Sequence, residues 1–184
     1  QLAIGAKAPS FALVNAVDGK TVTMKPDDGK LKVVIFTCNS CPYAKAFEPR
    51  IIEIAQKYGH KGVTFYAVDP NDDTKYSDET LANMKARAEE KEYPFPYLKD
   101  GDSNTARAYG ARVTPHVYLV DGEGIVRYRQ AAPLTAEDVK ATLERNLQPG
   151  KTVVQPGFAT IEAVQIVNPT TIRGRAPRRP RPSR

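Results

Sequence analysis

Two cysteines separated by two residues are the clearest chemical feature of this 184-residue sequence. Cys38 and Cys41 are its only cysteines, and Pro42 follows directly. The run Val33–Phe36 just before them is apolar and β-branched, which is typical of a buried strand. The residues after Pro42 have helical periodicity. The pair therefore lies where a strand turns into a helix, and its spacing brings both sulfurs within disulfide distance across one helical turn.

This position favours redox chemistry. The start of a helix offers unpaired N–H groups and the positive end of a dipole, which stabilise a thiolate at Cys38. Cys38 is then the nucleophile in thiol–disulfide exchange, and Cys41, one turn deeper, resolves the mixed disulfide. We expect Cys38 to be the more exposed and the more acidic of the two thiols.

Other uses of the pair fit the sequence less well. A structural disulfide two residues apart closes a very small loop and gains little entropy. Zinc would need two further ligands, and only His60 and His116 are available besides carboxylates, neither in paired spacing. Copper held by Cys38, Cys41 and His116 is a minority alternative. We therefore expect no cofactor beyond the redox-active disulfide between Cys38 and Cys41.

The predicted elements alternate between strands and helices, which indicates an α/β fold with a central mixed sheet and helices on both faces. A β-hairpin opens the chain, and a second hairpin makes the initially parallel sheet mixed. Pro49 is expected to kink the first helix or to end its first segment. The predicted strands are Phe11–Val14, Thr21–Met24, Val33–Phe36, Val63–Val68, an extended run over 93–98, Val117–Val120 and Ile125–Arg129; the predicted helices are 42–58, 79–91, 103–110 with Ser103 as cap, and 135–147.

The composition is that of an ordinary soluble globular protein, with 41% hydrophobic and 26% charged residues. No apolar run approaches the roughly 18 residues that a membrane span needs. Residues 1–150 are predicted to form one domain. Residues 151–184 are predicted to be an Arg- and Pro-rich extension that is disordered from about residue 168.

The formal net charge of +6 comes from the end of the chain. Six arginines and no acidic residue lie between Arg173 and Arg184. No basic face with interleaved aromatic residues is present, so specific nucleic-acid binding is not expected. The tail is predicted to be solvated, with at most a weak contact to polyanions.

The compartment is not decided by the sequence. Gln1 stands at the first position, and removal of an export signal is one explanation, which would place the protein in the periplasm. The cytoplasm is the alternative, because a single close cysteine pair occurs in either redox environment.

Four segments resemble the thioredoxin-like redoxins, the superfamily that includes thioredoxin, the TlpA-like reductases and the peroxiredoxins of the alkyl hydroperoxide reductase–thiol-specific antioxidant type. The resemblance covers about residues 4–147 and implies the thioredoxin fold, with an N-terminal β-hairpin extension and an inserted helix. The segments are Gly5–Phe11, Cys38–Pro42, Phe95–Asp100 with Ala108–Gly110, and Val113–Pro115 with Val117–Asp121.

The resemblance also implies further site residues. Thr114–Pro115 would be a cis peptide that lies against the cysteines, with Pro115 a catalytic residue. Proline lowers the cost of a cis bond and has no N–H to compete for a sulfur or a substrate strand. The backbone of Thr114 would pair with an extended substrate. Thr37, Asn39 and Ser40 are further candidates for substrate binding, and Asn39-Ser40 should tune the reduction potential.

Two features depart from thioredoxin. Thr37 stands where thioredoxins usually have tryptophan, and Lys32 occupies the place of their buried acid. A lysine near the sulfurs would favour the thiolate. Glu48 and Glu53, on the helix after the cysteines, are expected to be exposed helix charges.

The sequence therefore predicts a thiol–disulfide oxidoreductase that acts on protein or small-thiol partners and is served by an upstream reductant or oxidant. A peroxiredoxin-like thiol peroxidase is the first alternative. A peroxidatic cysteine normally stands in a Pro-x-x-x-Thr/Ser-x-x-Cys frame, whereas residues 34–37 before Cys38 lack the proline. A peroxiredoxin also does not need Cys41. A non-catalytic module that binds a protein or copper is the second alternative.

Overall fold

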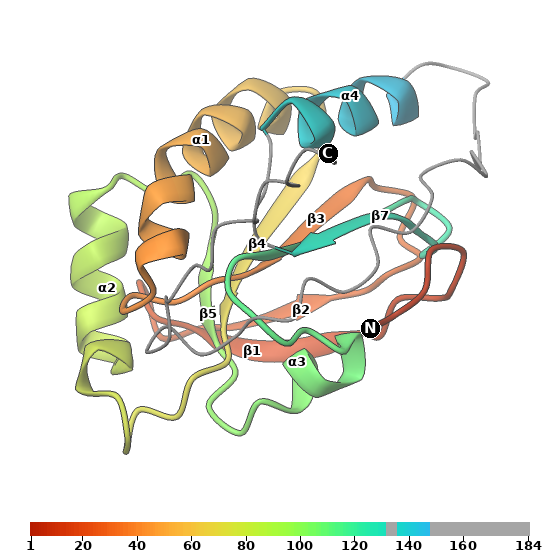
Figure 1. Ribbon diagram of the computed structural model, residues 1–184. Helices are drawn as coiled ribbons and strands as arrows, with labels where there is room; N and C mark the ends of the chain where they lie inside the picture. Colours follow the sequence, from red (N-terminus) through yellow and green to blue (C-terminus); the bar gives the residue numbers. More distant parts are fainter. Residues whose placement is uncertain (132–135, 148–184) are drawn as a thin grey trace, which may run out of the picture. The chain divides into compact units, whose positions relative to one another are not determined.

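A seven-stranded sheet with the order β2-β1-β5-β4-β3-β6-β7 is the centre of the protein (Figure 1). The computed structural model describes residues 1–131 and 136–147, and the strand count refers to these. The predicted extension over 151–184, including the predicted disorder from about 168, lies outside the described residues. The strands are β1 (Phe11–Asn15), β2 (Thr21–Met24), β3 (Lys32–Phe36), β4 (Thr64–Asp69), β5 (Tyr97–Lys99), β6 (His116–Val120) and β7 (Val126–Ala131).

The sheet is mixed, as the sequence predicts. Strand β3 pairs in parallel with β4, and β4 with β5, whereas β1, β2, β6 and β7 join in antiparallel pairs. All five residues of β3 are buried, because both faces of the sheet are covered. The helices are α1 (Pro42–Gly59), the 3₁₀ turn η1 (Ser77–Glu79), α2 (Leu81–Glu90), α3 (Asn104–Tyr109) and α4 (Ala136–Asn146).

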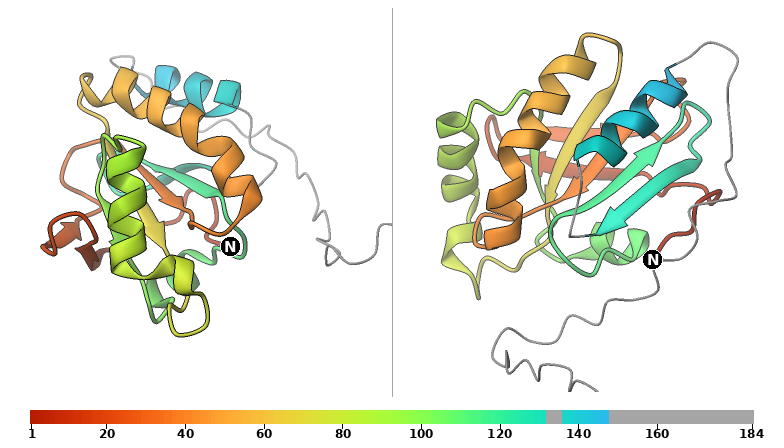
Figure 2. Two further views of the ribbon diagram at one scale, coloured as in Figure 1. Left: turned by 90° about the vertical axis from the view of Figure 1, so that its left-hand side faces the viewer. Right: turned by 45° about the horizontal axis from the view of Figure 1, so that its top comes forward.

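Two apolar clusters lie on opposite faces of the sheet, since alternate residues of a strand point to opposite sides. Helices α1, α2 and α4 supply Ile54, Met84 and Leu143 to the first cluster. Figure 2 shows α1 and α4 side by side over that face. Helix α3 supplies Tyr109 to the second cluster, where the N-terminal hairpin also packs. No helix within the described ranges is long and apolar enough to cross a membrane.

Helix α1 continues through Pro49, so the expected end of a first segment does not occur. A proline inside a helix removes one hydrogen bond, here the one to the carbonyl of Lys45. Pro49 and Lys45 are both exposed, so water can bond that carbonyl. Ile54 and Tyr58, on the opposite side of the helix, are buried in the first cluster and hold α1 on the sheet.

Ser103 is the N-cap residue of α3, as predicted, but its side chain makes no capping hydrogen bond. The Asp100 carboxylate accepts hydrogen bonds from the backbone N–H groups of Thr105 at 3.0 Å and Ala106 at 2.8 Å. Ser103 has a positive φ of 56° and its hydroxyl donates instead to the carbonyl of Pro70, at 2.6 Å. Asp100 therefore supplies the capping hydrogen bonds, because its carboxylate can accept from both unpaired N–H groups.

Glu48 corrects the expectation that it is an exposed helix charge. Its carboxylate is buried and accepts two hydrogen bonds from Arg87 of α2, from Nε at 2.7 Å and from Nη2 at 2.8 Å. The hydroxyl of Tyr93 also donates to it. Glu53 does point to solvent, where it pairs with Lys140 at 3.2 Å. Glu48 thus ties α1, which starts at the cysteines, to α2.

We expect Arg87→Met to lower the free energy of unfolding by about 3 kcal/mol, because it leaves the Glu48 carboxylate buried without its cation. Urea unfolding followed by circular dichroism measures this. Lys85→Met on the same helix is the control: its pair with Glu89 is exposed, so its loss should change stability by under about 0.5 kcal/mol. Equal effects of the two substitutions would contradict the assigned role of Glu48.

Candidate active site

The two cysteines lie in the turn between the end of β3 and the start of α1. Cys41 is the N-cap residue of α1, in an extended conformation, and Pro42 occupies the first turn. Proline suits that place because the N–H groups of a first turn have no helical partner. Both cysteines are free thiols; Cys38 is only 4% exposed, whereas Cys41 is partly exposed. The more exposed residue of the pair is therefore Cys41, contrary to the sequence-based expectation.

A loop from the other half of the chain reaches both sulfurs. The Thr114–Pro115 bond is cis, and Pro115 is buried directly before β6. The Sγ atom of Cys38 lies 3.1 Å from Oγ1 of Thr114, and the thiol of Cys41 donates to the Thr114 carbonyl oxygen at 3.2 Å. The antiparallel pairing of β3 with β6 sets Phe36 opposite His116, which brings this loop beside the cysteines.

The surroundings of Cys38 raise the pKa of its thiol, whereas the sequence predicts a more acidic thiol. Burial raises the pKa of Cys38, because a thiolate is poorly solvated there, and the charges of Glu79 and Cys41 raise it further. The hydroxyl of Thr114 and the backbone N–H of Cys41 act in the opposite direction but do not outweigh burial.

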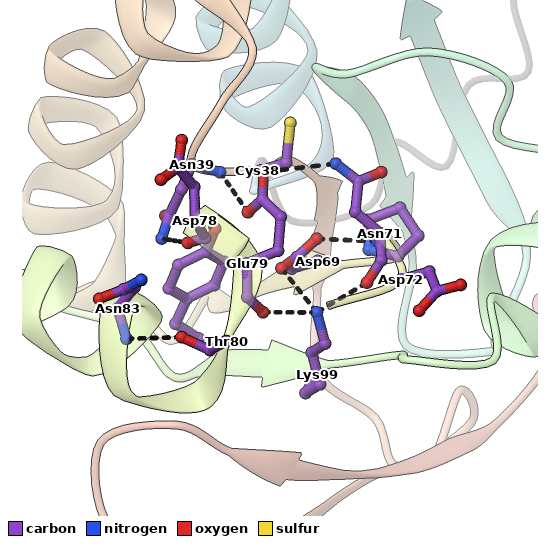
Figure 3. A network of polar contacts seen from close by, with 12 residues as sticks. Cys38, Asn39, Asp69, Asn71, Asp72, Asp78, Glu79, Thr80, Asn83 and Lys99 are labelled. Atoms are coloured by element: carbon purple, nitrogen blue, oxygen red, sulfur yellow. Dashed lines mark hydrogen bonds and ion pairs between the residues drawn. The ribbon is translucent and has the colours of Figure 1, made fainter. Parts of the chain in front are cut away.

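Glu79 is the site residue that the sequence did not reveal. Its buried carboxylate accepts from the backbone N–H groups of Asn39 at 2.8 Å and Ser40 at 2.9 Å, and from the Ser40 hydroxyl at 2.5 Å (Figure 3). Burial alone would raise the pKa of Glu79, but these bonds and one from Asn71 hold it below its ordinary value. Glu79 is forty residues from Asn39 in the sequence, and no local pattern distinguishes it from an acid at a helix start.

Asn39 and Ser40, predicted to contact substrate, have their side chains engaged within the protein. The amide of Asn39 donates to the backbone carbonyl of Asp78 at 2.8 Å and accepts from the hydroxyl of Tyr97 at 3.0 Å. The Ser40 hydroxyl bonds to Glu79. Through these contacts the side chains of both residues hold the cysteine loop in position. Thr37 is partly exposed, and its N–H donates to the Val68 carbonyl at 2.9 Å.

The largely buried cation of Lys99 holds the segment that carries Glu79. The ammonium of Lys99 bonds to the Asp69 carboxylate at 3.1 Å, and to the backbone carbonyls of Asn71 and Glu79, each at 2.7 Å. Figure 3 shows these groups gathered at the ends of β4 and β5, beneath the cysteine loop. Burial, and next the charge of Glu79, raise the pKa of Asp69 to about 7.

Lys32 corrects the idea that a lysine favours the thiolate. It begins β3, whereas the cysteines follow the other end of that strand. Its buried ammonium bonds to the carbonyls of Pro26 at 2.9 Å and Lys30 at 2.7 Å, and pairs with Asp28. The other four residues of β3, at about 3.3 Å each, and Thr37 separate it from Cys38, so its charge does not face the sulfurs.

His116 follows Pro115 and is fully buried. Its ring stacks on Tyr118 with centroids 4.6 Å apart, and neither ring nitrogen has a hydrogen-bond partner among the described residues. Burial, and next the charge of Arg129, lower the pKa of His116 to about 4. Within residues 1–131 and 136–147, no three His, Cys, Asp or Glu side chains gather as a metal site, so the copper alternative lacks an assembled ligand set.

Comparison with known proteins agrees with this fold. The sequence profile of the AhpC/TSA family matches residues 4–129. The chain belongs to the AhpC/TSA family. Among curated relatives, a protein named thiol-disulfide oxidoreductase ResA from Bacillus thuringiensis is 27% identical over 145 residues, 79% of each chain. A protein named thiol:disulfide interchange protein DsbE from Allochromatium vinosum is 26% identical over 134 residues, 71% of this chain and 67% of that one.

Solved structures give the same result for the fold. An uncharacterised conserved protein from Geobacillus kaustophilus is 36% identical, with a TM-score of 0.74 over 80% of this chain and 83% of that one. A putative DsbE from Chlorobium tepidum has a TM-score of 0.68 over 80% of this chain and all of that one; at 23% identity it supports the fold alone. The predicted thioredoxin-like fold is confirmed, and the relatives support the prediction of an oxidoreductase at the level of the family.

The contact between Thr114 and Cys38 yields a prediction about reactivity. Thr114→Val keeps the shape of the side chain and removes the hydroxyl, so the pKa of Cys38 should rise. Alkylation of Cys38 by iodoacetamide near pH 7.5 should slow by about three- to tenfold, since the thiolate is the reacting species. Thr114→Ser keeps the hydroxyl and should react at close to the wild-type rate. A Val variant that is folded and reacts as fast as the wild type would show that the hydroxyl does not act on Cys38.

Buried His116 predicts a loss of stability in acid. Because its folded pKa of about 4 lies below the ordinary 6.5, the unfolded chain takes up the proton first as the pH falls. This stability is complete above about pH 6.5 and is lost toward pH 4, by about 3 kcal/mol. In His116→Phe this loss should be absent, so its unfolding free energy relative to wild type should rise as the pH falls. Parallel curves for the two proteins would refute the assignment.

Proposed function

We propose that this protein exchanges thiols and disulfides with protein or small-thiol partners through Cys38 and Cys41. The observation that carries the proposal is the contact of one loop residue, Thr114, with both sulfurs, at 3.1 Å and 3.2 Å. A structural pair of thiols needs no such arrangement. The names of the ResA and DsbE relatives support the same class of reaction.

In the proposed reaction, Cys38 loses its proton and its thiolate attacks one sulfur of a substrate disulfide. A mixed disulfide forms and one substrate sulfur leaves as a thiolate. Cys41 then loses its proton and attacks Sγ of Cys38, which releases the second substrate sulfur and forms the Cys38–Cys41 disulfide. Two electrons pass to the substrate. An upstream dithiol restores the pair, or the same steps run in reverse if the partner is an oxidant.

Hydrogen bonds in the reduced state fit these roles. The contact of Cys38 with the Thr114 hydroxyl and that with the backbone N–H of Cys41 both lower the pKa of Cys38 and so favour its thiolate. The thiol of Cys41 instead donates a hydrogen bond to the Thr114 carbonyl oxygen. Once a disulfide forms, that carbonyl has no thiol donor and is free to accept from the N–H of an extended substrate peptide. Pro115, with no N–H, adds no competing donor beside it.

The disulfide itself is the redox centre in this proposal, and no other cofactor is required. Copper binding is disfavoured because Cys38, Cys41 and His116 do not form a ligand group in the described structure. Peroxide reduction is the alternative that membership of the AhpC/TSA family keeps open. Exchange is favoured over it, because a second thiol is already in place two residues after Cys38, and the proline of the peroxidatic frame is missing.

The test is reduction of insulin by dithiothreitol with the wild type, Cys38→Ser and Cys41→Ser. The wild type should accelerate it, and Cys38→Ser should lose at least about 100-fold of that activity, because the nucleophile is gone. Cys41→Ser should accumulate a mixed disulfide between Cys38 and substrate, visible by mass spectrometry. Because both variants carry the same Cys→Ser change at neighbouring positions, a folded Cys41→Ser protein shows that such a change is tolerated, and the reverse holds for Cys38→Ser.

Peroxide consumption is measured on the same three proteins. Rapid turnover of hydrogen peroxide that survives Cys41→Ser, with negligible insulin reduction, would replace the proposal by a thiol peroxidase. Mixed disulfides that accumulate only in Cys38→Ser would keep exchange but make Cys41 the attacking sulfur.

A further inference from the structure

The loop between the two sulfurs has three backbone N–H groups, and two of them do not donate to a cysteine sulfur. Those of Asn39 and Ser40 donate to the two carboxylate oxygens of Glu79, at 2.8 Å and 2.9 Å. Only the N–H of Cys41 acts on Cys38. A buried anion from a distant part of the chain therefore already occupies the donors that a thiolate at this turn would otherwise attract.

We propose that Glu79 is a positioning residue that controls how readily Cys38 loses its proton, by holding the loop and by placing a fixed negative charge beside it. The inference about proton loss stands on the geometry of the loop. Its consequence for the speed of exchange rests on the function proposed above.

The charge of Glu79 is fixed and uncompensated by a direct partner. Four hydrogen bonds to its carboxylate, from Asn39, from Ser40 twice and from Asn71, favour the ionised form. No lysine or arginine in the described ranges makes an ion pair with this carboxylate. Lys99, the nearest cation in the network, donates to the backbone carbonyl of Glu79 and forms its ion pair with Asp69 instead.

Other titratable groups around the site do not supply the same effect. Tyr97 faces Cys38, but burial raises the pKa of Tyr97 far above its ordinary value, so it carries no charge near neutral pH. Cys41 also faces Cys38, and the experiment below replaces it with serine in every protein compared. Asp69 lies behind Glu79 and is paired with Lys99. Asp78 points its carboxylate to solvent, where water screens it. Glu79 is therefore the one buried carboxylate among these groups whose charge is not paired with a cation.

Two influences thus oppose each other at Cys38. Thr114 and the N–H of Cys41 favour the thiolate, whereas burial and Glu79 oppose it. Because attack requires the thiolate, the rate of reaction near neutral pH should depend on how this balance is set. Glu79 adds a contribution that a single substitution can remove while the burial of Cys38 is kept.

The experiment is the pH dependence of Cys38 alkylation in Cys41→Ser background proteins that carry wild-type Glu79, Glu79→Gln or Asp78→Asn. Glutamine keeps the size and one acceptor oxygen but removes the charge, so the midpoint of the profile should move to lower pH. The rate near pH 7.5 should rise by about three- to tenfold, since one unit of pKa is a tenfold change in thiolate. Asp78→Asn removes one exposed charge from the same segment and should leave the profile unchanged.

A charge effect and a purely structural clamp give different results. Ser40→Ala removes one hydrogen bond to Glu79 but keeps the charge, so its midpoint should stay or rise. A folded Glu79→Gln with an unmoved or higher midpoint would overturn the proposal. If Glu79→Gln does not fold, the Ser40→Ala protein is the test. A lower midpoint of Cys38 alkylation in Ser40→Ala would show that loop geometry sets the pKa of Cys38 and would overturn the proposal. An unchanged or higher midpoint supports it.

These measurements use only iodoacetamide and a folded protein. They are independent of whether insulin or any other disulfide is reduced. Failure of the exchange assay would therefore leave the result on Glu79 intact, and failure of the Glu79 prediction would leave the proposed exchange intact.

Discussion

The contact of Thr114 with both cysteine sulfurs depends on the antiparallel pairing of β3 with β6. Seventy-six residues separate Cys38 from Thr114, and nothing local joins them. The register that sets Phe36 opposite His116 brings the end of one strand beside the start of the other, so the loops beyond them must meet. Both strands are buried on both faces, and a slip by one residue would turn each side chain to the opposite face, into the wrong cluster, so packing on both faces favours the observed register.

A second long-range contact shapes the same site from the opposite side. The segment after β4 brings Glu79 under the cysteine loop, and Lys99 and Asp69 hold that segment at the ends of β4 and β5. The loop is thus held by a hydroxyl and a carbonyl of Thr114 on one side and by a carboxylate on the other. The first side favours the Cys38 thiolate and the second opposes it, so the reactivity of the pair reflects a balance between distant segments rather than the helix start alone.

The sequence predicted what local patterns encode. The cysteine pair before a helix and the mixed sheet follow from a short motif and from periodicity, whereas the place of the Thr114–Pro115 loop was implied by the resemblance to the thioredoxin-like redoxins. Glu79 was missed, and Lys32 and Glu48 were misplaced, because a charged residue is classified only by what packs against it. Lys32 bonds to carbonyls at the far end of β3, and Glu48 meets Arg87 of another helix. The acidity of Cys38 was wrong for the same reason: a helix start favours a thiolate, but burial and a partner from elsewhere reverse the direction.

The central claim is that Cys38 and Cys41 form one reversible redox couple. Equilibration of the protein in buffers with graded ratios of oxidised and reduced glutathione, followed by acid quenching and mass spectrometry, tests it most directly. The account predicts one cooperative two-electron transition, in which the protein loses two hydrogen atoms and peptide mapping finds a Cys38–Cys41 disulfide that dithiothreitol reverses. Two thiols that never join at any ratio, or a cysteine that oxidises irreversibly to a sulfinic acid instead, would contradict it.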